Sequence, residues 1–236
     1  MTPDKHKAEL RKLTGLCGDT DIDMANSEEG KDANYFIAIR VSDGRIRDKV
    51  RTVQNKVVSR YDRLKPFLIP SETLHLTLLV IHLEDEEKAM ASEILEQCRT
   101  EIRKSVLPSG GFTLKFKGLS YFPNPQKKRP PRVLYVKPFR KEGIESLLDK
   151  VRRVVKDTFK NRGIPPADRH RDWIPHTAVI KLRENPSKGN EIPKESFEND
   201  IDSDFGEEQV SSLYLCPIGE KKAKDGFYKW EAKIDL

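Results

Sequence analysis

The sequence predicts an α+β domain in which two similar lobes face each other across a cleft. Two observations lead to this prediction. Apolar strand-like segments alternate irregularly with amphipathic helical segments along most of the 236-residue chain. Two of the strand-like segments each contain a histidine, His75 and His176, at comparable places in the two halves of the chain. No short tandem repeat accompanies this long-range correspondence.

The first 33 residues are predicted to form a flexible acidic arm, and the domain is expected to span residues 34–236. The arm carries five basic and eight acidic residues, a net charge of −3, and most of it lacks hydrophobic periodicity. Because the whole chain has a net charge of +6, residues 34–236 carry +9. A basic domain favours anionic partners such as nucleic acids and nucleotides, although a lysine-rich solvated surface is the alternative.

The composition excludes several classes of protein. Ten Phe, six Tyr and two Trp argue against a wholly disordered chain. No apolar run is long enough to cross a membrane, and residues 1–20 contain no apolar segment of signal-peptide type. The three cysteines are far apart and form no CxxC pair, so we expect a reducing compartment, the cytoplasm or the nucleus, and no structural zinc.

The first half of the domain is expected to contain two strands and two helices. Residues 34–41 (NYFIAIRV) are predicted to form a buried strand, and residues 74–83, the most hydrophobic stretch of the chain, a central strand. The intervening helix has an apolar stripe at spacings of four, three and four, formed by Ile46, Val50, Val53 and Val57. The second helix follows the acidic residues 84–87, which suit a helix N-terminus, and it ends before Pro108.

The second half is expected to continue with two strands, a long helix, a third strand and a short helix before the last two strands. The helix has a broad apolar stripe and ends at Gly163, a typical residue after a helix C-terminus. The predicted ranges are 112–116 and 132–136 for the first strands, 142–161 for the long helix, 174–182 for the third strand, 193–201 for the short helix, and 208–216 and 227–234 for the last strands.

The segment around His75 places an imidazole and a hydroxyl on one face of a strand. Alternate side chains of a strand share a face, so His75 and Thr77 are predicted to point the same way. A hydroxyl can donate a hydrogen bond to a phosphate oxygen, while a histidine can transfer a proton near neutral pH. A core histidine beside a strand threonine is the alternative, and the His-x-Thr triplet alone favours that alternative.

The second histidine segment, His176-Thr177-Ala178, departs from the first. By alternation Ala178 shares the face of His176, so one hydroxyl is missing unless a bulge turns Thr177 inward. Thr77 and Thr177 are the predicted phosphate ligands. No role is assigned to the other histidines, His6, His82 and His170.

Taken in order, these motifs resemble the two-histidine (2H) phosphoesterase superfamily. They are similar to the central phosphoesterase-like domain of A-kinase anchoring protein 7 over about residues 34–236. The segments that carry the resemblance are Asn34–Phe36, Leu74–Val80 (LHLTLLV), Pro175–Ala178 (PHTA) with Lys181-Leu182 after it, and Phe205–Glu208 (FGEE).

The resemblance implies a bilobal fold with pseudo-twofold symmetry, in which each lobe contributes one histidine strand to a shared cleft. It also implies metal-independent cleavage of a phosphodiester in an RNA-like molecule, without a cofactor. Relatives act on 2′,5′-linked oligoadenylates, 2′,3′-cyclic phosphates or RNA ends, and some bind nucleoside monophosphates. Carried over by position, His75 and His176 are the acid/base pair and Thr77 is a phosphate ligand, whereas Ala178 stands where the second hydroxyl is expected.

Base recognition is predicted to use stacking and cationic side chains. The candidate nucleotide-binding residues are Tyr35, Tyr121, Phe122, Lys128, Arg129 and Trp173, whereas Phe36 is expected in the core. Lys128 and Arg129 belong to a proline-rich loop that suits a polyanion. An exposed loop without a ligand and a nuclear import signal are the alternatives for this cationic run.

Two main functions follow from these residues. The first is a phosphodiesterase that cleaves 2′,5′-linked oligoadenylates. The second is a nucleotide- or RNA-binding module with weak or lost activity, which Ala178 favours. A protein-interaction scaffold has weaker support. Expected partners are 2′,5′-oligoadenylate, RNA or AMP, the chain is expected to be monomeric, and no kinase-anchoring helix is expected after the last strand.

Overall fold

The computed structural model describes residues 31–122, 131–167, 172–182 and 191–236. Residues 1–30 of the predicted arm (residues 1–33) and the predicted ligands Lys128 and Arg129 lie outside these ranges. Two antiparallel sheets form the described fold. The strands are β1 (Tyr35–Arg40), β2 (His75–Ile81), β3 (Phe112–Phe122), β4 (Val133–Pro138), β5 (Thr177–Lys181), β6 (Asp204–Val210), β7 (Ser212–Pro217) and β8 (Ala232–Asp235).

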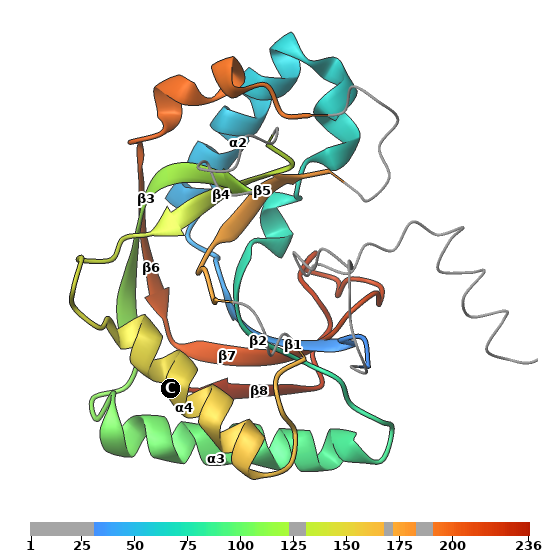
Figure 1. The fold of residues 1–236 in the computed structure, drawn as a ribbon, viewed down its shortest axis with the longest axis vertical. Coiled ribbons are helices and arrows are strands. Elements are labelled where there is room, and N and C mark those ends of the chain that lie inside the picture. Colours follow the sequence, from blue (N-terminus) through green and yellow to red (C-terminus); the bar gives the residue numbers. More distant parts are fainter. Residues whose placement is uncertain (1–30, 123–130, 168–171, 183–190) are drawn as a thin grey trace, which may run out of the picture.

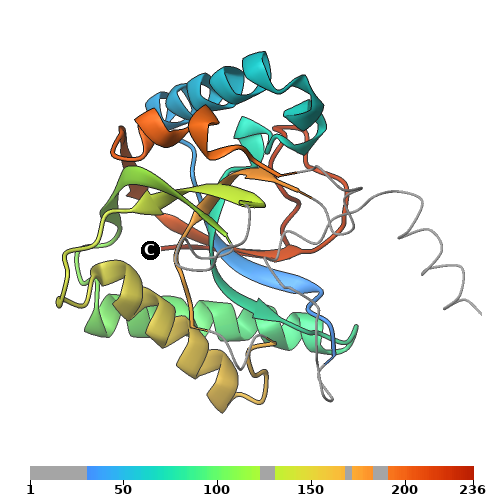
Figure 2. The same ribbon diagram turned by 45° about the horizontal axis from the view of Figure 1, so that its top comes forward.

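Each sheet is the framework of one lobe. The first sheet has the strand order β2-β1-β7-β8, and the second has the order β5-β4-β3-β6. Helices α3 (Glu87–Ser105) and α4 (Leu147–Asn161) cover the first sheet, whereas α2 (Gly44–Arg60) covers the second, as Figures 1 and 2 show. The predicted α+β class with two lobes is therefore confirmed. No helix in the described ranges is long and apolar enough to cross a membrane.

The chain crosses between the lobes before each histidine strand. Between β1 and β2 it forms α2, which packs against β5 and β6 of the other sheet. Between β4 and β5 it forms α4, which packs against β2 and α3 of the first lobe. This exchange gives the fold its pseudo-twofold symmetry, because each lobe is covered by the helix that precedes the histidine strand of the other.

Local capping determines where the helices begin. In α2 the Asp43 side chain accepts hydrogen bonds from the Arg45 and Ile46 amides, and the predicted apolar stripe is buried. The prediction that the long helix begins at residue 142 is wrong, because Ser146 and Asp149 form a capping box that starts α4 at Leu147. Gly143, at φ +71°, lies in the turn before it.

Two strand boundaries also differ from the prediction. The expected strand 208–216 is two strands in different sheets, because the chain passes from the second sheet to the first at Ser211, between β6 and β7. The expected strand 227–234 is confined to β8, and before it only a single bridge joins Tyr228 to Lys222. The short helix predicted at 193–201 consists of two 3-10 turns, η3 (Lys194–Ser196) and η4 (Glu198–Asp200).

A small apolar cluster lies beside the first histidine strand, apart from the main core. It contains Phe36, Ala38, Val80, Cys216, Phe227 and Tyr228. The rings of Phe36 and Tyr228 both contact the His75 ring. Before His75, the turns η1 (Asp62–Phe67) and η2 (Ser71–Thr73) connect α2 to β2. The cluster therefore forms one wall of the region in which the two lobes meet.

Candidate active site

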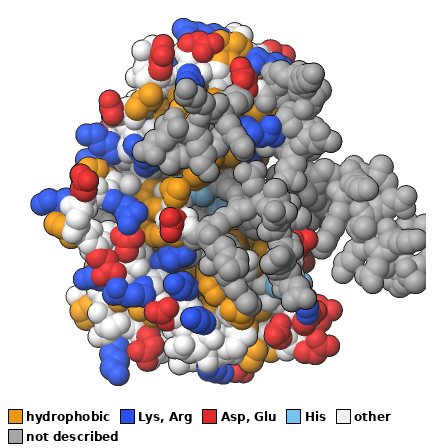
Figure 3. Space-filling model, viewed as in Figure 1, with side chains coloured by type: hydrophobic (Ala, Val, Ile, Leu, Met, Phe, Trp, Pro, Cys, Tyr) orange, Lys and Arg blue, Asp and Glu red, His pale blue; other side chains and the backbone are white. Residues whose placement is uncertain are grey.

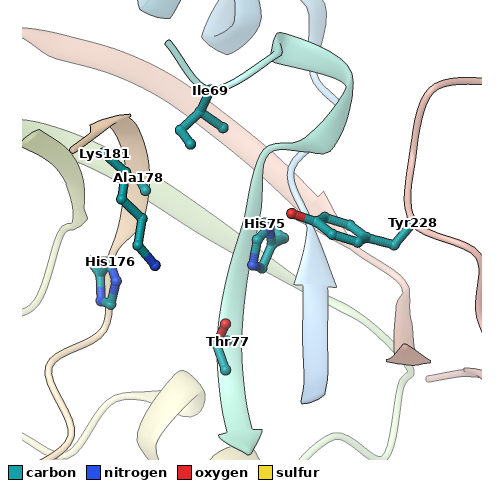
Figure 4. Close-up of a pocket in the computed structure, with 7 residues that line it drawn as sticks. All are labelled: Ile69, His75, Thr77, His176, Ala178, Lys181 and Tyr228. Atoms are coloured by element: carbon teal, nitrogen blue, oxygen red, sulfur yellow. The ribbon is translucent and has the colours of Figure 1, made fainter. Parts of the chain in front are cut away.

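Two histidines from different lobes line one pocket. His75 is the first residue of β2, and His176 immediately precedes β5. Figure 4 shows both rings beside the same space. The described residues that line the pocket are Ile69, His75, Thr77, His176, Ala178, Lys181 and Tyr228. In Figure 3 a histidine surface is visible in a hollow near the middle of the face, with hydrophobic side chains next to it.

The backbone holds the two imidazole rings in the same way. His75 Nδ1 lies 2.8 Å from the carbonyl oxygen of Thr73, and His176 Nδ1 lies 2.7 Å from that of Ile174. A carbonyl oxygen only accepts hydrogen bonds, so the hydrogen of each neutral ring is assigned to Nδ1. The Nε2 atom of each ring is then the nitrogen that can take up or deliver a proton.

Aromatic rings restrain each imidazole further. The His75 ring has its centroid 5.1 Å from those of Phe36 and Tyr228. The His176 ring lies 5.1 Å from Phe122 and 5.2 Å from Tyr135. These distances are typical of aromatic packing, so each ring is fixed by two neighbours as well as by its hydrogen bond.

A β-bulge interrupts each histidine strand three residues after the histidine. In β2, Thr77 is opposite Ala38 and Leu79 is opposite Ile37, so Leu78 is the extra residue. In β5, Ala178 is opposite Tyr135 and Ile180 is opposite Leu134, so Val179 is the extra residue. A bulge reverses the alternation beyond it. Residues at positions two and five after each histidine therefore share its face.

The structure separates the three predicted hydroxyl positions. Thr77 lines the pocket beside His75, and Ala178 lines it beside His176. Thr177 is only 1% exposed, and its hydroxyl has no hydrogen-bond partner in the described part of the chain. The bulge falls after Ala178 rather than at Thr177, so it does not turn Thr177 inward. This placement argues against Thr177 as a phosphate ligand.

The predicted stacking residues lie in three different environments. Tyr35 and Tyr121 are buried in the main core, and this burial argues against their predicted role as nucleotide ligands. Phe122 packs edge-on against His176. Trp173 donates from its indole nitrogen to the Thr77 carbonyl at 3.0 Å, with the Arg152 guanidinium 4.6 Å from its ring centroid. Trp173 thus contacts the backbone of β2 and does not line the pocket.

Three residues that line the pocket were not predicted from the sequence: Ile69, Lys181 and Tyr228. Lys181 is five positions after His176, and regular alternation assigns an odd spacing to the opposite face. Tyr228 comes from the far end of the chain, and no local sequence pattern indicates that it lies beside His75. The Lys222 ammonium lies 3.0 Å from the centroid of the Tyr228 ring. The described residues contain no group of three or more His, Cys, Asp and Glu side chains placed to hold a metal ion.

Known proteins with similar sequences point to one family. The family described as "AKAP7 2'5' RNA ligase-like domain" matches residues 33–236. Human A-kinase anchor protein 7 isoform gamma is 27% identical over 206 residues, which cover 85% of this chain but only 56% of that protein. The chain therefore spans little more than half the length of that relative. An RNA 2′,3′-cyclic phosphodiesterase of Archaeoglobus fulgidus is 30% identical over 185 residues, 76% of this chain and 88% of that enzyme.

Solved structures with the same fold agree with this result. TT0787 of Thermus thermophilus superimposes with a TM-score of 0.56 at 21% identity, covering 86% of this chain and 97% of that one. LigT of E. coli, solved in complex with ATP, gives a TM-score of 0.51 at 16% identity and covers 87% of this chain and 99% of its own. At these identities the likeness concerns the fold alone. Together with the family match over residues 33–236, it shows that the chain belongs to the AKAP7 2′5′ RNA ligase-like family, within the 2H phosphoesterase superfamily.

Proposed function

We propose that this chain is a phosphodiesterase that cleaves RNA-like phosphodiesters by paired-histidine acid/base catalysis, with 2′,5′-linked oligoadenylates as its preferred substrates. One observation carries the proposal: two histidines from different lobes line one pocket, and each has its Nδ1 directed to a backbone carbonyl. This arrangement suits a reaction that takes up one proton and delivers another. The name of the archaeal relative, an RNA 2′,3′-cyclic phosphodiesterase, supports the same reaction class.

The mechanism for a 2′,5′ diester uses both histidines in one displacement. One neutral imidazole takes the proton from the ribose 3′-hydroxyl through Nε2, and the 3′-oxygen attacks phosphorus in line. The other imidazole, protonated, delivers its proton to the departing 5′-oxygen. Thr77, which lines the pocket beside His75, donates a hydrogen bond to a non-bridging oxygen as charge develops. The products are a 2′,3′-cyclic phosphate and a 5′-hydroxyl.

A second candidate function is a nucleotide-binding module with little or no turnover. The observation that favours it is Ala178, which brings a methyl group to the pocket where a second hydroxyl is expected. Loss of one hydrogen bond to a charged phosphate costs about 1.5–3 kcal/mol. At the transition state this corresponds to a rate loss of about 10- to 150-fold, which slows an enzyme without abolishing its activity.

The substrate panel that tests the proposal contains 2′,5′-linked triadenylate, 3′,5′-linked triadenylate and a 2′,3′-cyclic phosphate, each assayed with EDTA. Faster cleavage of the 2′,5′ linkage supports the proposal. If only the cyclic phosphate is turned over, the chain is still a phosphodiesterase, but the proposed preference for 2′,5′-linked oligoadenylates is wrong. Tight binding of AMP with no turnover of any of the three substrates establishes the binding module instead.

A further inference from the structure

We propose that Lys181 is the phosphate ligand of the second lobe and takes the place of the hydroxyl that Ala178 lacks. Its ammonium group binds a non-bridging oxygen of the scissile phosphate opposite Thr77. This inference rests on the proposed function, because it assigns a role in the same pocket. It adds a residue that the two His-x-Thr-like triplets do not contain.

The bulge at Val179 brings Lys181 into the pocket. Without the extra residue, Lys181 would lie on the face opposite His176, since the two are five positions apart. With the bulge, His176, Ala178 and Lys181 all line the pocket. Figure 4 shows the Lys181 side chain running from β5 alongside His176, with its nitrogen directed toward the space between the two histidines. The side chain therefore reaches past the methyl group of Ala178.

The two lobes differ at the equivalent position. Five residues after His75 is Val80, which is 6% exposed and belongs to the small apolar cluster beside β2. The first lobe thus combines the Thr77 hydroxyl with an apolar side chain, and the second combines the methyl group of Ala178 with an ammonium. Each lobe supplies one phosphate ligand, at different positions of the same strand pattern.

An ammonium group is well suited to this position. Negative charge on the non-bridging oxygens must be stabilised while one oxygen attacks phosphorus and another leaves. A charge-assisted hydrogen bond from an ammonium is about twice as strong as a neutral one. The described residues that line the pocket include no Asp or Glu, so this lining presents no carboxylate that would repel a phosphate. Lys181 therefore adds a positive charge to a lining that otherwise suits an anion.

The first test replaces Lys181 by Met, by Gln and by Arg, with Lys137→Met as the matched control. Lys137 is an exposed lysine on the adjacent strand β4 and does not line the pocket. We expect the Met and Gln variants to lose about 10- to 150-fold in kcat/KM on 2′,5′-triadenylate. The Arg variant should retain more activity than either, and Lys137→Met should match the wild type. Equal activity of Lys181→Met and Lys137→Met would overturn the proposal.

A binding measurement separates this inference from the proposed function. AMP affinity is measured over a range of salt concentrations for the wild type and for Lys181→Met. Loss of one phosphate contact should weaken AMP binding and make its salt dependence shallower. If the wild type turns over no diester, the proposed function fails, yet a weakened and less salt-dependent binding of AMP still supports Lys181 as the phosphate ligand. Unchanged AMP binding in Lys181→Met contradicts the inference even if the enzyme is active.

Restoring the missing hydroxyl gives a second, independent test. Ala178→Thr is combined with Lys181→Met, and the four proteins of the cycle are compared. If Lys181 substitutes for the hydroxyl, the Met substitution should cost less in the Ala178→Thr background than in the wild type. Equal losses in both backgrounds would show that Lys181 does not replace the missing group.

Discussion

A backbone carbonyl two residues earlier in the chain orients each of the two pocket histidines. This contact is made by Thr73 for His75 and by Ile174 for His176. Strand alternation was enough to predict that His75 and Thr77 share a face. It could not predict Lys181, because a bulge depends on how two strands pair rather than on the residues of one of them. The contact between Tyr228 and His75 could not be predicted either, because the two residues lie far apart in the chain.

At the residue scale, paired-histidine catalysis predicts a bell-shaped pH dependence of kcat/KM. One histidine must be neutral to accept a proton and the other protonated to donate one, so activity should fall on both sides of an optimum between about pH 5 and 8. The rate of 2′,5′-triadenylate cleavage at constant ionic strength measures this profile. A flat profile across that interval would argue strongly against two titrating histidines.

At the element scale, α2 and α4 each donate a side-chain hydrogen bond to the backbone carbonyl of the bulged residue in the histidine strand of the other lobe. From α4, Arg152 Nε donates to the carbonyl of Leu78 at 3.1 Å. From α2, Gln54 Nε2 donates to the carbonyl of Val179 at 2.9 Å and to that of Ile69 at 2.7 Å. The helices were predictable from their apolar stripes, whereas these contacts were not, because they join residues far apart in the chain. Each lobe thereby positions the histidine strand of the other.

Gln54→Leu should destabilise the protein and slow turnover. Gln54 is 5% exposed, and its loss leaves the carbonyl of Ile69 without this buried donor and removes one of the donors to Val179. We expect about 1–3 kcal/mol less free energy of unfolding, together with a lower kcat, measured by denaturant titration and by cleavage assays. Gln97→Leu, at an exposed position of α3, is the control. A variant at position 54 that is as stable and as active as this control would contradict the role of the bulge contact.

At the scale of the whole molecule, the chain crosses repeatedly between the two lobes, and it buries Cys98 of α3 and Cys216 of β7 in the first lobe. Hydrophobic periodicity predicted most strands and helices, and the matching histidine segments predicted the two-lobed arrangement. The passage from β6 to β7 was missed because residues 208–216 contain no Gly or Pro to interrupt a strand, and only the pairing partners divide the segment between two sheets. Strand partners are a property of the whole fold, which a single segment does not encode.

Thiol labelling should report unfolding of the first lobe, which contains both Cys98 and Cys216. Burial raises the pKa of both the Cys98 and the Cys216 thiol to about 12, and both side chains are inaccessible. We expect a Cys17→Ser variant to react negligibly with a thiol reagent at pH 8. In guanidinium, two thiols per molecule should react. Rapid labelling of either cysteine under native conditions would show that the first lobe opens locally.

The most direct test of the central claim compares His75→Ala, His176→Ala and His82→Ala on 2′,5′-triadenylate. His82 is the control, because its ring does not line the pocket and its Nδ1 contacts the carbonyl of Asp32. We expect His75→Ala and His176→Ala each to lose at least about 10²- to 10⁴-fold in kcat, whereas His82→Ala retains wild-type turnover and yields the 2′,3′-cyclic product. Wild-type turnover in either His75→Ala or His176→Ala would contradict paired-histidine catalysis.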